Sequence, residues 1–253
     1  VEIVSTAGAE ADRELARTAA ASGRYDAIVA AGGDGTLRAL AAGLVGSPVA
    51  LGLVPLGTGN VMATELGLHR HAARLADGLL TAPARGVKPG LANGAPFMLM
   101  ASAGVDARIL ARLDLGVKRR IGQLAYVPPT LAELGRRLDS FPVTLDGRET
   151  QCTWVIVSRV RFYGGRFVVA PDQRLGDDGF HAVLVRTTSR LGLARVLLAA
   201  AAGRLASCPL VEIRPCRTAR IGGDVPVQVD GEEAGRAPLD IALGTETVRL
   251  IVP

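Results

Sequence analysis

Apolar runs of strand length alternate with helical patterns over the first third of the chain. Residues 26–31 and 49–54 are short apolar runs, which are typical of buried parallel strands. Between them, apolar side chains recur at the i, i+3, i+4 and i+7 spacing of one helix face, at Leu37, Leu40, Ala41 and Leu44. Further elements are expected as a strand at 1–4, helices at 9–22 and 61–66, and a helix through Ala72, Leu75, Ala76 and Leu79. This order predicts a right-handed α/β unit with a parallel sheet over residues 1–84.

The pattern changes after Pro83, where strand-like segments and hairpin turns become frequent. Asn93-Gly94 and Asp146-Gly147 are hairpin signals, and Asp230-Gly231 resembles them. Strands are expected around 97–102, 141–146, 151–158, 166–170, 180–186, 209–214, 217–221, 226–230 and 246–252. Helices are expected near 104–115, 123–138 (broken near Pro128-Pro129) and 190–205. We therefore predict a second, β-rich domain over residues 85–253, folded as a sandwich of mainly antiparallel strands.

Two glycine-rich turns follow the strands of the α/β unit. Gly32-Gly33-Asp34-Gly35-Thr36 follows the first of them and Pro55-Leu56-Gly57-Thr58-Gly59-Asn60 the second. The carboxyl ends of neighbouring parallel strands are where α/β sheets bind ligands, and free N–H groups at a helix start favour phosphate. The first turn alone favours a phosphate site over a plain βα connection, because Asp34 and Thr36 add metal and hydroxyl chemistry. The second turn alone is equally consistent with either, whereas the pair indicates a crevice for nucleotide phosphates. Neither turn is a Walker A loop or a GxGxxG fingerprint.

Two acidic stretches in the second half are candidates for chemistry. Leu175-Gly176-Asp177-Asp178-Gly179-Phe180 combines adjacent carboxylates with carbonyls and suits a hard cation, although a solvated acidic turn has the same composition. In Val227–Glu233, strand alternation puts Gln228 and Asp230 on the polar face, and Glu232 joins them if the strand continues. A carboxylate there can accept a hydroxyl proton. A plain hairpin tip like Asp146-Gly147 has the same pattern, and the sequence does not separate the two.

The composition excludes some classes of function but does not identify one. The 253 residues carry a net charge of +5 and 49% of them are hydrophobic, which indicates a globular chain compatible with nucleotides, anionic membranes or nucleic acid. Only 4% are aromatic, so a stacking platform for nucleic acid is not expected. The cysteines form no metal-binding pattern and are expected to be buried thiols, at Cys152, Cys208 and Cys216. No signal peptide or apolar run of about 18 residues is visible, which favours a cytoplasmic protein, soluble or peripheral to a membrane.

The pair of glycine turns, together with Asp177-Asp178-Gly179 and Val229-Asp230-Gly231-Glu232, resembles the diacylglycerol kinase catalytic family. Relatives of that family include bacterial lipid kinases and sphingosine kinases, and the match covers nearly the whole chain. Gly-Gly-Asp-Gly-Thr alone is shared with NAD kinases and phosphofructokinases, but the second turn and the late Asp-Gly-Glu favour a lipid kinase. The resemblance implies an α/β domain followed by a β-rich, lipid-binding domain. It also implies ATP-dependent transfer of the γ-phosphate to the hydroxyl of diacylglycerol or a related lipid.

The resemblance also implies residue roles. The phosphates of ATP would be held by the two turns, at Gly32, Gly33, Asp34, Gly35, Thr36, Gly57, Thr58 and Asn60, with Thr6 as a further nucleotide contact. Asp34 would also organise the catalytic Mg²⁺. A second, structural Mg²⁺ would be bound by Asp178 and by the carbonyls of Leu175 and Phe180. Asp230 and Glu232 match the pair that contains the general base of the family, and the resemblance does not decide between them.

Some features depart from the family pattern or leave alternatives open. Family members normally begin with a strand ending in Asn-Pro-x-Ser-Gly, whereas this sequence begins at what looks like the second strand. An exposed sheet edge, or a partner strand as in a homodimer, is therefore expected. Arg38-Ala39 stands where the family usually has Asn-Glu. The alternatives to a lipid kinase are an enzyme like NAD kinase and a non-catalytic nucleotide- or lipid-binding protein.

A lipid substrate implies contact with a membrane surface. The basic run Lys118-Arg119-Arg120 and the basic, apolar helix at 190–205 are candidates for that contact. A solvated helix end and a helix packed on the sheet are the simpler interpretations of the same two segments. The sequence does not indicate which hydroxylated lipid would be the substrate.

Overall fold

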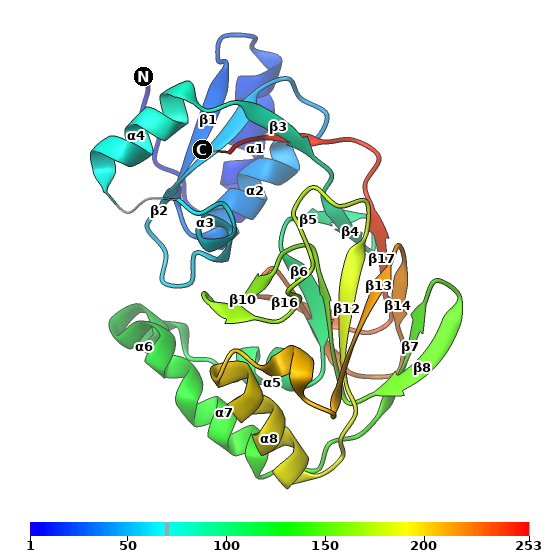
Figure 1. Cartoon of the computed structure of the whole chain (residues 1–253). Coiled ribbons are helices and arrows are strands. Elements are labelled where there is room, and N and C mark those ends of the chain that lie inside the picture. Colours follow the sequence, from blue (N-terminus) through cyan, green and yellow to red (C-terminus); the bar gives the residue numbers. More distant parts are fainter. Residues whose placement is uncertain (69–70, 253) are drawn as a thin grey trace.

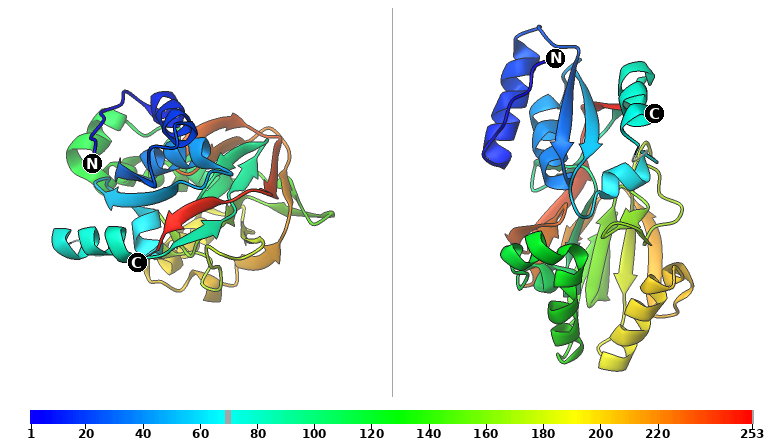
Figure 2. Two further views of the ribbon diagram at one scale, coloured as in Figure 1. Left: turned by 90° about the horizontal axis from the view of Figure 1, so that it is seen from above. Right: turned by 90° about the vertical axis from the view of Figure 1, so that its left-hand side faces the viewer.

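The computed structural model describes residues 1–68 and 71–252, which form an α/β part and a β-rich part (Figure 1). The α/β part contains the first third of the chain together with its last strand, so both ends of the chain lie there. The β-rich part is elongated, with its strands running away from the α/β part (Figure 2). No helix among the described residues is long and apolar enough to cross a bilayer. The expected fold class, an α/β domain followed by a β-rich domain, is confirmed.

The sheet of the α/β part has the strand order β1-β2-β18-β3. Its strands are β1 (Ala27–Gly32), β2 (Ala50–Pro55), β3 (Ala84–Val87) and β18 (Val248–Ile251), and its helices are α1 (Ala9–Ala21), α2 (Asp34–Leu44), α3 (Val61–Glu65) and α4 (Ala72–Thr81). The β1-β2 and β2-β18 pairs are parallel, and β3 is antiparallel to β18. The predicted helix face is confirmed, since all four of its apolar side chains are buried in α2.

Two expectations about the α/β part are wrong in detail. Residues 1–4 form no strand, and the side chains of Val1 and Ile3 are exposed, so β1 lies at the edge of the sheet. The domain boundary expected at residue 84 also leaves out β18, the last strand of the chain. This strand returns to the α/β sheet, where it lies between β2 and β3 and pairs with both. The apolar run at 246–252 predicts this strand but not its sheet, because strand pairing depends on tertiary packing.

The β-rich part is a sandwich of two six-stranded sheets. One has the order β13-β12-β9-β6-β15-β16, formed by β6 (Met100–Ala103), β9 (Trp154–Ser158), β12 (Phe180–Val185), β13 (Val211–Cys216), β15 (Pro226–Val229) and β16 (Glu232–Arg236). The other has the order β5-β4-β17-β14-β7-β8, formed by β4 (Gly90–Ala92), β5 (Ala95–Phe97), β7 (Phe141–Leu145), β8 (Arg148–Cys152), β14 (Ala219–Ile221) and β17 (Leu239–Leu243). Neighbouring strands pair in the antiparallel sense, as predicted. A two-stranded ribbon, β10 (Phe162–Tyr163) and β11 (Phe167–Val168), lies beside them.

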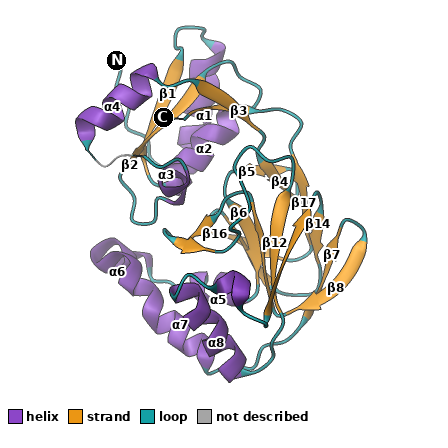
Figure 3. Cartoon of the chain, in the orientation of Figure 1, coloured by secondary structure: helices purple, strands orange, loops and turns teal. Residues whose placement is uncertain are grey.

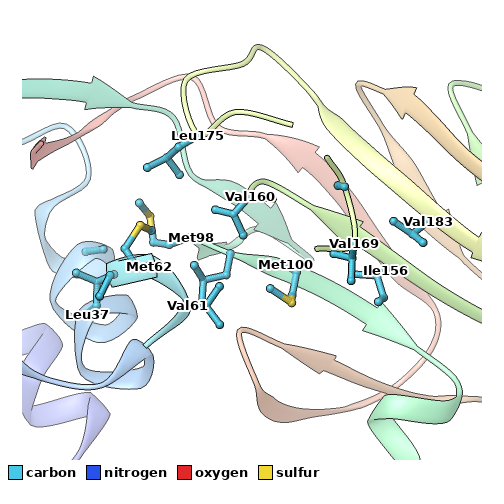
Figure 4. Packing of buried hydrophobic residues seen from close by; sticks show 14 of the residues in the cluster. Leu37, Val61, Met62, Met98, Met100, Ile156, Val160, Val169, Leu175 and Val183 are labelled. Atoms are coloured by element: carbon cyan, nitrogen blue, oxygen red, sulfur yellow. The ribbon is translucent and has the colours of Figure 1, made fainter. Parts of the chain in front are cut away.

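The strand β9 shows how the layers pack, because all of its residues are buried. Side chains alternate along a strand, so Val155 and Val157 join the core between the two sheets, whereas Trp154 and Ile156 join the core on the other face. This second core continues into the α/β part. Figure 4 shows its members Leu37, Val61, Met62, Met98, Met100, Ile156, Val160, Val169, Leu175 and Val183. One continuous apolar core therefore joins the two parts of the molecule.

Helices cover the outer face of the sheet that contains β9 (Figure 3). They are α5 (Val105–Leu110), α6 (Leu115–Ile121), the 3₁₀ turn η1 (Gly122–Tyr126), α7 (Val127–Leu134), α8 (Arg190–Ala201) and the 3₁₀ turn η2 (Leu205–Ser207). Pro128 and Pro129 lie in the first turn of α7, where proline is tolerated because the N–H group has no helical partner. The predicted break is thus a helix start. The three cysteines are buried and free, as expected.

Candidate active site

The two glycine turns lie against each other at one edge of the sheet. Gly32 pairs with Pro55 at the ends of the parallel strands β1 and β2, so both turns leave the same edge. A Cβ built on Gly57 would lie 2.7 Å from Gly33 Cα, and one built on Gly32 would lie 2.5 Å from Thr36 Oγ1. Side chains at these positions would collide, which explains the glycines. The first turn opens directly into α2, whose N-terminal amides favour an anion.

Asp34 joins the two turns. Its carboxylate oxygens accept hydrogen bonds from the N–H groups of Val61 (2.9 Å) and Met62 (3.1 Å), the first residues of α3. Asn60 has a left-handed φ of 47°, and its side-chain amide donates to the Gly57 carbonyl. The Asn60 Oδ1 atom is buried and has no hydrogen-bond partner among the described residues. A buried acceptor of this kind is usually satisfied by a ligand, an ion or a water, which fits a bound nucleotide with its hydrated cation.

The hairpin between β15 and β16 brings Glu232 to the start of α2. A Cβ built on Gly35 would lie 3.0 Å from Glu232 Oε1, and Glu232 Oε2 forms an ion pair of 3.0 Å with Arg38. The guanidinium of Arg38 also donates to the Val229 carbonyl at 3.0 Å, so it binds the hairpin twice. The side chain of Glu232 remains half-exposed. The β15-β16 hairpin and the start of α2 are therefore in contact, although Arg38 and Val229 are 191 positions apart in the sequence.

Asp230 has a different environment from that of Glu232. It is 5% exposed, and its carboxylate accepts hydrogen bonds from the N–H groups of Met98, Leu99 and Met100 at 2.8, 2.8 and 2.9 Å. Burial raises the pKa of the Asp230 carboxyl to about 6, because the three amides and the charge of Arg38 offset only part of the desolvation. Both carboxylate oxygens are bound to backbone, so Asp230 fixes the hairpin to the segment before β6.

A buried polar network next to the β15-β16 hairpin is not predicted from the sequence. It is centred on the Asp106 carboxylate. The hydroxyls of Ser102 and Tyr163 donate to the Asp106 carboxylate, the latter at 2.9 Å. The Gln228 amide donates to Ser102 Oγ at 2.7 Å, and its Oε1 accepts from the Gly231 N–H at 2.8 Å. Burial raises the pKa of Asp106. The network therefore supports the hairpin turn, and no local sequence signal shows that this aspartate is buried.

The three threonines assigned to the nucleotide differ in their positions. Thr36 lies in the first turn of α2. Thr58 lies in the second glycine turn, and its Cγ2 is 3.9 Å from a Cβ built on Gly122, where η1 begins. Thr6 instead donates its hydroxyl to Asp12 in α1, and the described residues show no bond between Thr6 and either glycine turn. The structure thus brings together the predicted nucleotide residues with the exception of Thr6.

The turn expected to hold a structural Mg²⁺ is bound by basic side chains from other segments. Asp178 pairs with Lys88 Nζ at 2.7 Å. The Leu175 carbonyl accepts from the Arg159 guanidinium at 3.0 Å, and the Phe180 ring centroid lies 5.6 Å from the guanidinium carbon. Two of the three expected ligands are therefore bound to cations of the protein itself, and the donor set does not fit Mg²⁺. No group of three or more His, Cys, Asp or Glu side chains in the described part of the chain could hold a metal ion.

The architecture and the paired glycine turns define a two-part protein of the class that includes diacylglycerol kinases and NAD kinases. The model of the diacylglycerol kinase catalytic domain matches residues 1–91, and the model of the YegS C-terminal NAD kinase beta sandwich-like domain matches residues 100–252. The chain belongs to the diacylglycerol kinase family.

Curated relatives agree with this assignment, and solved structures share the fold. The chain is 26% identical to a diacylglycerol kinase of Bacillus subtilis (strain 168), over 96% of this chain and 82% of that protein. It is 28% identical to a diacylglycerol kinase of Mycobacterium tuberculosis (strain H37Rv), over 100% and 85%. The crystal structure of a diacylglycerol kinase from Bacillus anthracis str. Sterne has a TM-score of 0.72 at 18% identity and covers 100% of this chain and 85% of that one. Another structure from that strain has a TM-score of 0.81 at 21% identity, with 98% and 83% covered.

Proposed function

We propose that this protein is an ATP-dependent kinase that transfers the γ-phosphate of ATP to the hydroxyl of diacylglycerol or a related lipid. The observation that carries the proposal is the contact between the Glu232 carboxylate and the start of α2 at Gly35. A carboxylate at that point lies within reach of a hydroxyl that attacks a phosphate held by the glycine turns. A hairpin with a purely structural role has no need of this contact.

The glycine turns fit the phosphates of ATP. Their missing side chains leave room for a close approach of backbone to ligand, and the N-terminus of α2 favours negative charge. The oxygens of Asp34 and Asn60 Oδ1, which has no hydrogen-bond partner among the described residues, suit a hydrated Mg²⁺ beside the phosphates. When bound, Mg²⁺ and ATP supply the transferable phosphoryl group and part of the charge neutralisation.

Between the two candidate bases, we assign the role to Glu232. Its side chain is half-exposed and forms an ion pair with Arg38, so it is accessible to a substrate hydroxyl beside the glycine turns. Asp230 is buried with both oxygens bound to backbone N–H groups, so its role is to position the hairpin. In a loose transition state the base orients the hydroxyl and accepts its proton late, which an ordinary carboxylate can do.

Transfer of labelled phosphate from ATP to a panel of acceptors tests the proposal. The panel contains diacylglycerol, a sphingoid base and phosphatidylglycerol in mixed micelles, and NAD as a soluble acceptor. The wild-type protein is expected to label a lipid. Glu232→Gln should lower the rate about 100-fold or more, because the amide can orient the hydroxyl but cannot accept its proton. Glu233→Gln is the matched control, since Glu233 is the exposed neighbour on the same strand, and should keep the wild-type rate.

The outcomes separate the alternatives. A labelled dinucleotide without labelled lipid would support an enzyme like NAD kinase. No product with any acceptor, together with ATP binding, would support a non-catalytic member of the family. A lipid product that Glu232→Gln forms at the wild-type rate would remove Glu232 from the mechanism.

We also propose that the lipid reaches the two glycine turns along a helical surface that contacts the membrane. Large exposed apolar side chains gather on α6, η1, α7 and α8, namely Val117, Ile121, Leu124, Val127, Leu131, Leu191 and Leu198. These helices lie together at the end of the molecule away from the α/β sheet (Figure 3). Arg120, Arg190 and Arg195 are exposed on the same helices, which suits anionic lipid, while the side chains of Lys118 and Arg119 lie outside the described residues. Because Gly122 adjoins Thr58, this surface begins beside the second glycine turn.

Vesicle sedimentation tests this contact. Vesicles of phosphatidylcholine with a minority of phosphatidylglycerol are expected to bind the wild-type protein. The double variant Leu124→Glu with Leu131→Glu should reduce binding about tenfold or more, because two apolar side chains can no longer enter the bilayer interface. Leu80→Glu is the control, since Leu80 is 86% exposed on α4 in the other part of the molecule. Equal binding by the double variant and the control would contradict the proposed surface.

A further inference from the structure

The guanidinium of Arg159 lies inside a group of four backbone carbonyls. Arg159 follows β9 directly and is 1% exposed. One of its terminal nitrogens donates to the carbonyls of Asp177 and Gly179, both at 2.6 Å. The other donates to the carbonyls of Lys88 at 2.9 Å and Leu175 at 3.0 Å. The guanidinium therefore ties the turn at 175–179 to the segment that follows β3.

We propose that Arg159, assisted by Lys88, is the resident cation of this turn and takes the place of a divalent metal, so that the turn is stable without a metal ion. Converging carbonyl oxygens are the donors that a hard cation uses, and here a planar guanidinium satisfies them with several N–H groups. A divalent cation in the same carbonyl group would be repelled by the guanidinium at short range. The site thus keeps the oxygen donors of a cation site while a side chain provides the charge.

The carboxylates of the turn are also satisfied without a metal. Asp177 accepts hydrogen bonds from the Arg174 N–H at 2.7 Å and from the Gln173 amide at 3.2 Å. Asp178 pairs with Lys88 Nζ at 2.7 Å. Burial lowers the pKa of Arg159 to about 10, and the nearby charges of the two aspartates oppose this shift, so the guanidinium stays protonated at neutral pH. Positive and negative groups are therefore matched within the chain.

The resident cation is connected to the hairpin of the candidate active site. The Arg159 N–H donates to the Leu99 carbonyl at 2.8 Å, and the Leu99 N–H donates to Asp230 at 2.8 Å. A turn that needed a metal at this place would make the hairpin depend on metal concentration. With Arg159 in place, this turn and the hairpin connected to it need no divalent cation.

Thermal unfolding of the full chain without nucleotide tests the proposal. The wild-type protein should unfold at the same temperature in EDTA, in Mg²⁺ and in Ca²⁺, to within about 1 °C, because no metal binds the folded state at this turn. Arg159→Met keeps the apolar stem of the side chain but removes the guanidinium that donates to the four carbonyls, so its Tm should fall by about 5 °C or more. Trypsin should then cleave faster after Arg174, which is exposed in the same turn.

Two further variants keep the test decisive. Arg220→Met removes an arginine from an exposed ion pair with Asp240, and its Tm should change by under about 2 °C. Arg159→Lys keeps a cation with fewer donors and should unfold between the wild type and Arg159→Met. If Arg159→Met does not fold, the Arg159→Lys value and the metal response of the wild type decide.

Two results would overturn the proposal. One is a nucleotide-free wild type whose Tm rises by several degrees in Mg²⁺ or Ca²⁺, with the rise lost in Asp178→Asn. The other is an Arg159→Met or Arg159→Lys protein as stable as the wild type. None of these measurements requires phosphate transfer, so a failure here is distinct from a failure of the proposed kinase activity.

Discussion

Two Asp-Gly hairpins in this chain have the same backbone and the same way of using their aspartate. Asp146-Gly147 joins β7 to β8 with φ values of 47° and 79°, and Asp230-Gly231 joins β15 to β16 with 52° and 80°. Two positive φ values in succession are the signature of a type I′ turn. In each, the aspartate N–H donates to a neighbouring carbonyl, of Thr218 at 3.1 Å or of Met100 at 2.8 Å. Each carboxylate then accepts successive N–H groups of that same neighbouring segment.

The two turns differ in burial, and burial reverses the electrostatics. For Asp146, which is exposed, desolvation is the largest single effect on the pKa, but the hydrogen bonds from Thr218 and Arg217 together outweigh it, so the pKa is lowered. For Asp230, desolvation outweighs three amide hydrogen bonds, and the pKa is raised to about 6. The two aspartates thus make the same kind of hydrogen bonds, and the degree of burial decides whether the carboxyl pKa is raised or lowered. It follows that an Asp-Gly tip is not itself a catalytic signal, and that the role proposed for Glu232 rests on its contact with α2.

The largest expected difference between the hairpins comes from removing the two carboxylates. Asp230→Ala should lower the free energy of unfolding at pH 7 by about 3 kcal/mol or more, because each of three buried N–H groups left without an acceptor costs about 1 to 3 kcal/mol. Asp146→Ala should cost under about 1 kcal/mol, because water can replace the carboxylate at an exposed turn. Urea unfolding of both variants measures the difference. Equal losses would mean that burial does not distinguish the two turns.

The pH dependence of stability should have opposite signs for the two aspartates. A raised folded-state pKa stabilises the fold at low pH, and this contribution is lost as pH rises from the unfolded value, near 4, through about 6. The stability advantage of wild type over Asp230→Ala should therefore shrink by about 2 kcal/mol between about pH 4.5 and about pH 7.5.

The lowered pKa of Asp146 predicts the opposite trend. Its contribution is present above the unfolded-state pKa and is lost as pH falls through the folded-state value, so the advantage of wild type over Asp146→Ala should shrink on acidification. Urea titrations of wild type and both variants across this pH range provide the comparison. A shift of the same sign for both aspartates would contradict the assigned environments.

Turns and single helices can be predicted from this sequence because the patterns that specify them extend over only a few residues. The glycine turns, the α2 face and the Asp-Gly turns depend on backbone conformation and on periodicity over a few residues. The resemblance to a family added the pairing of the first turn with Glu232, which no spacing in the sequence reveals. The end of the chain shows the limit, since β18 is a recognisable strand whose partners, β2 and β3, are set by packing.

Residue roles that depend on burial were beyond sequence reasoning. Asp34 and Asp178 are both acidic residues next to glycine, yet one joins two turns and the other pairs with a lysine. No local pattern in the sequence marks Arg159, because an arginine after a strand is usually solvated. Its role depends on four carbonyls that the fold brings together from distant segments.

The smallest expected difference concerns the glycines of the two turns, where the hairpins should behave alike. Gly147 and Gly231 have φ values of 79° and 80°, and a Cβ built on either would have no neighbour within 4 Å. Alanine at either position therefore meets only the conformational cost of a left-handed backbone, roughly 1 to 2 kcal/mol. The losses in urea unfolding for Gly147→Ala and Gly231→Ala should agree within about 0.5 kcal/mol, because the two alanines meet the same conformational cost. A clearly larger loss at Gly231 would show that the buried hairpin is also strained in its backbone, and that burial is not the whole difference between the two turns.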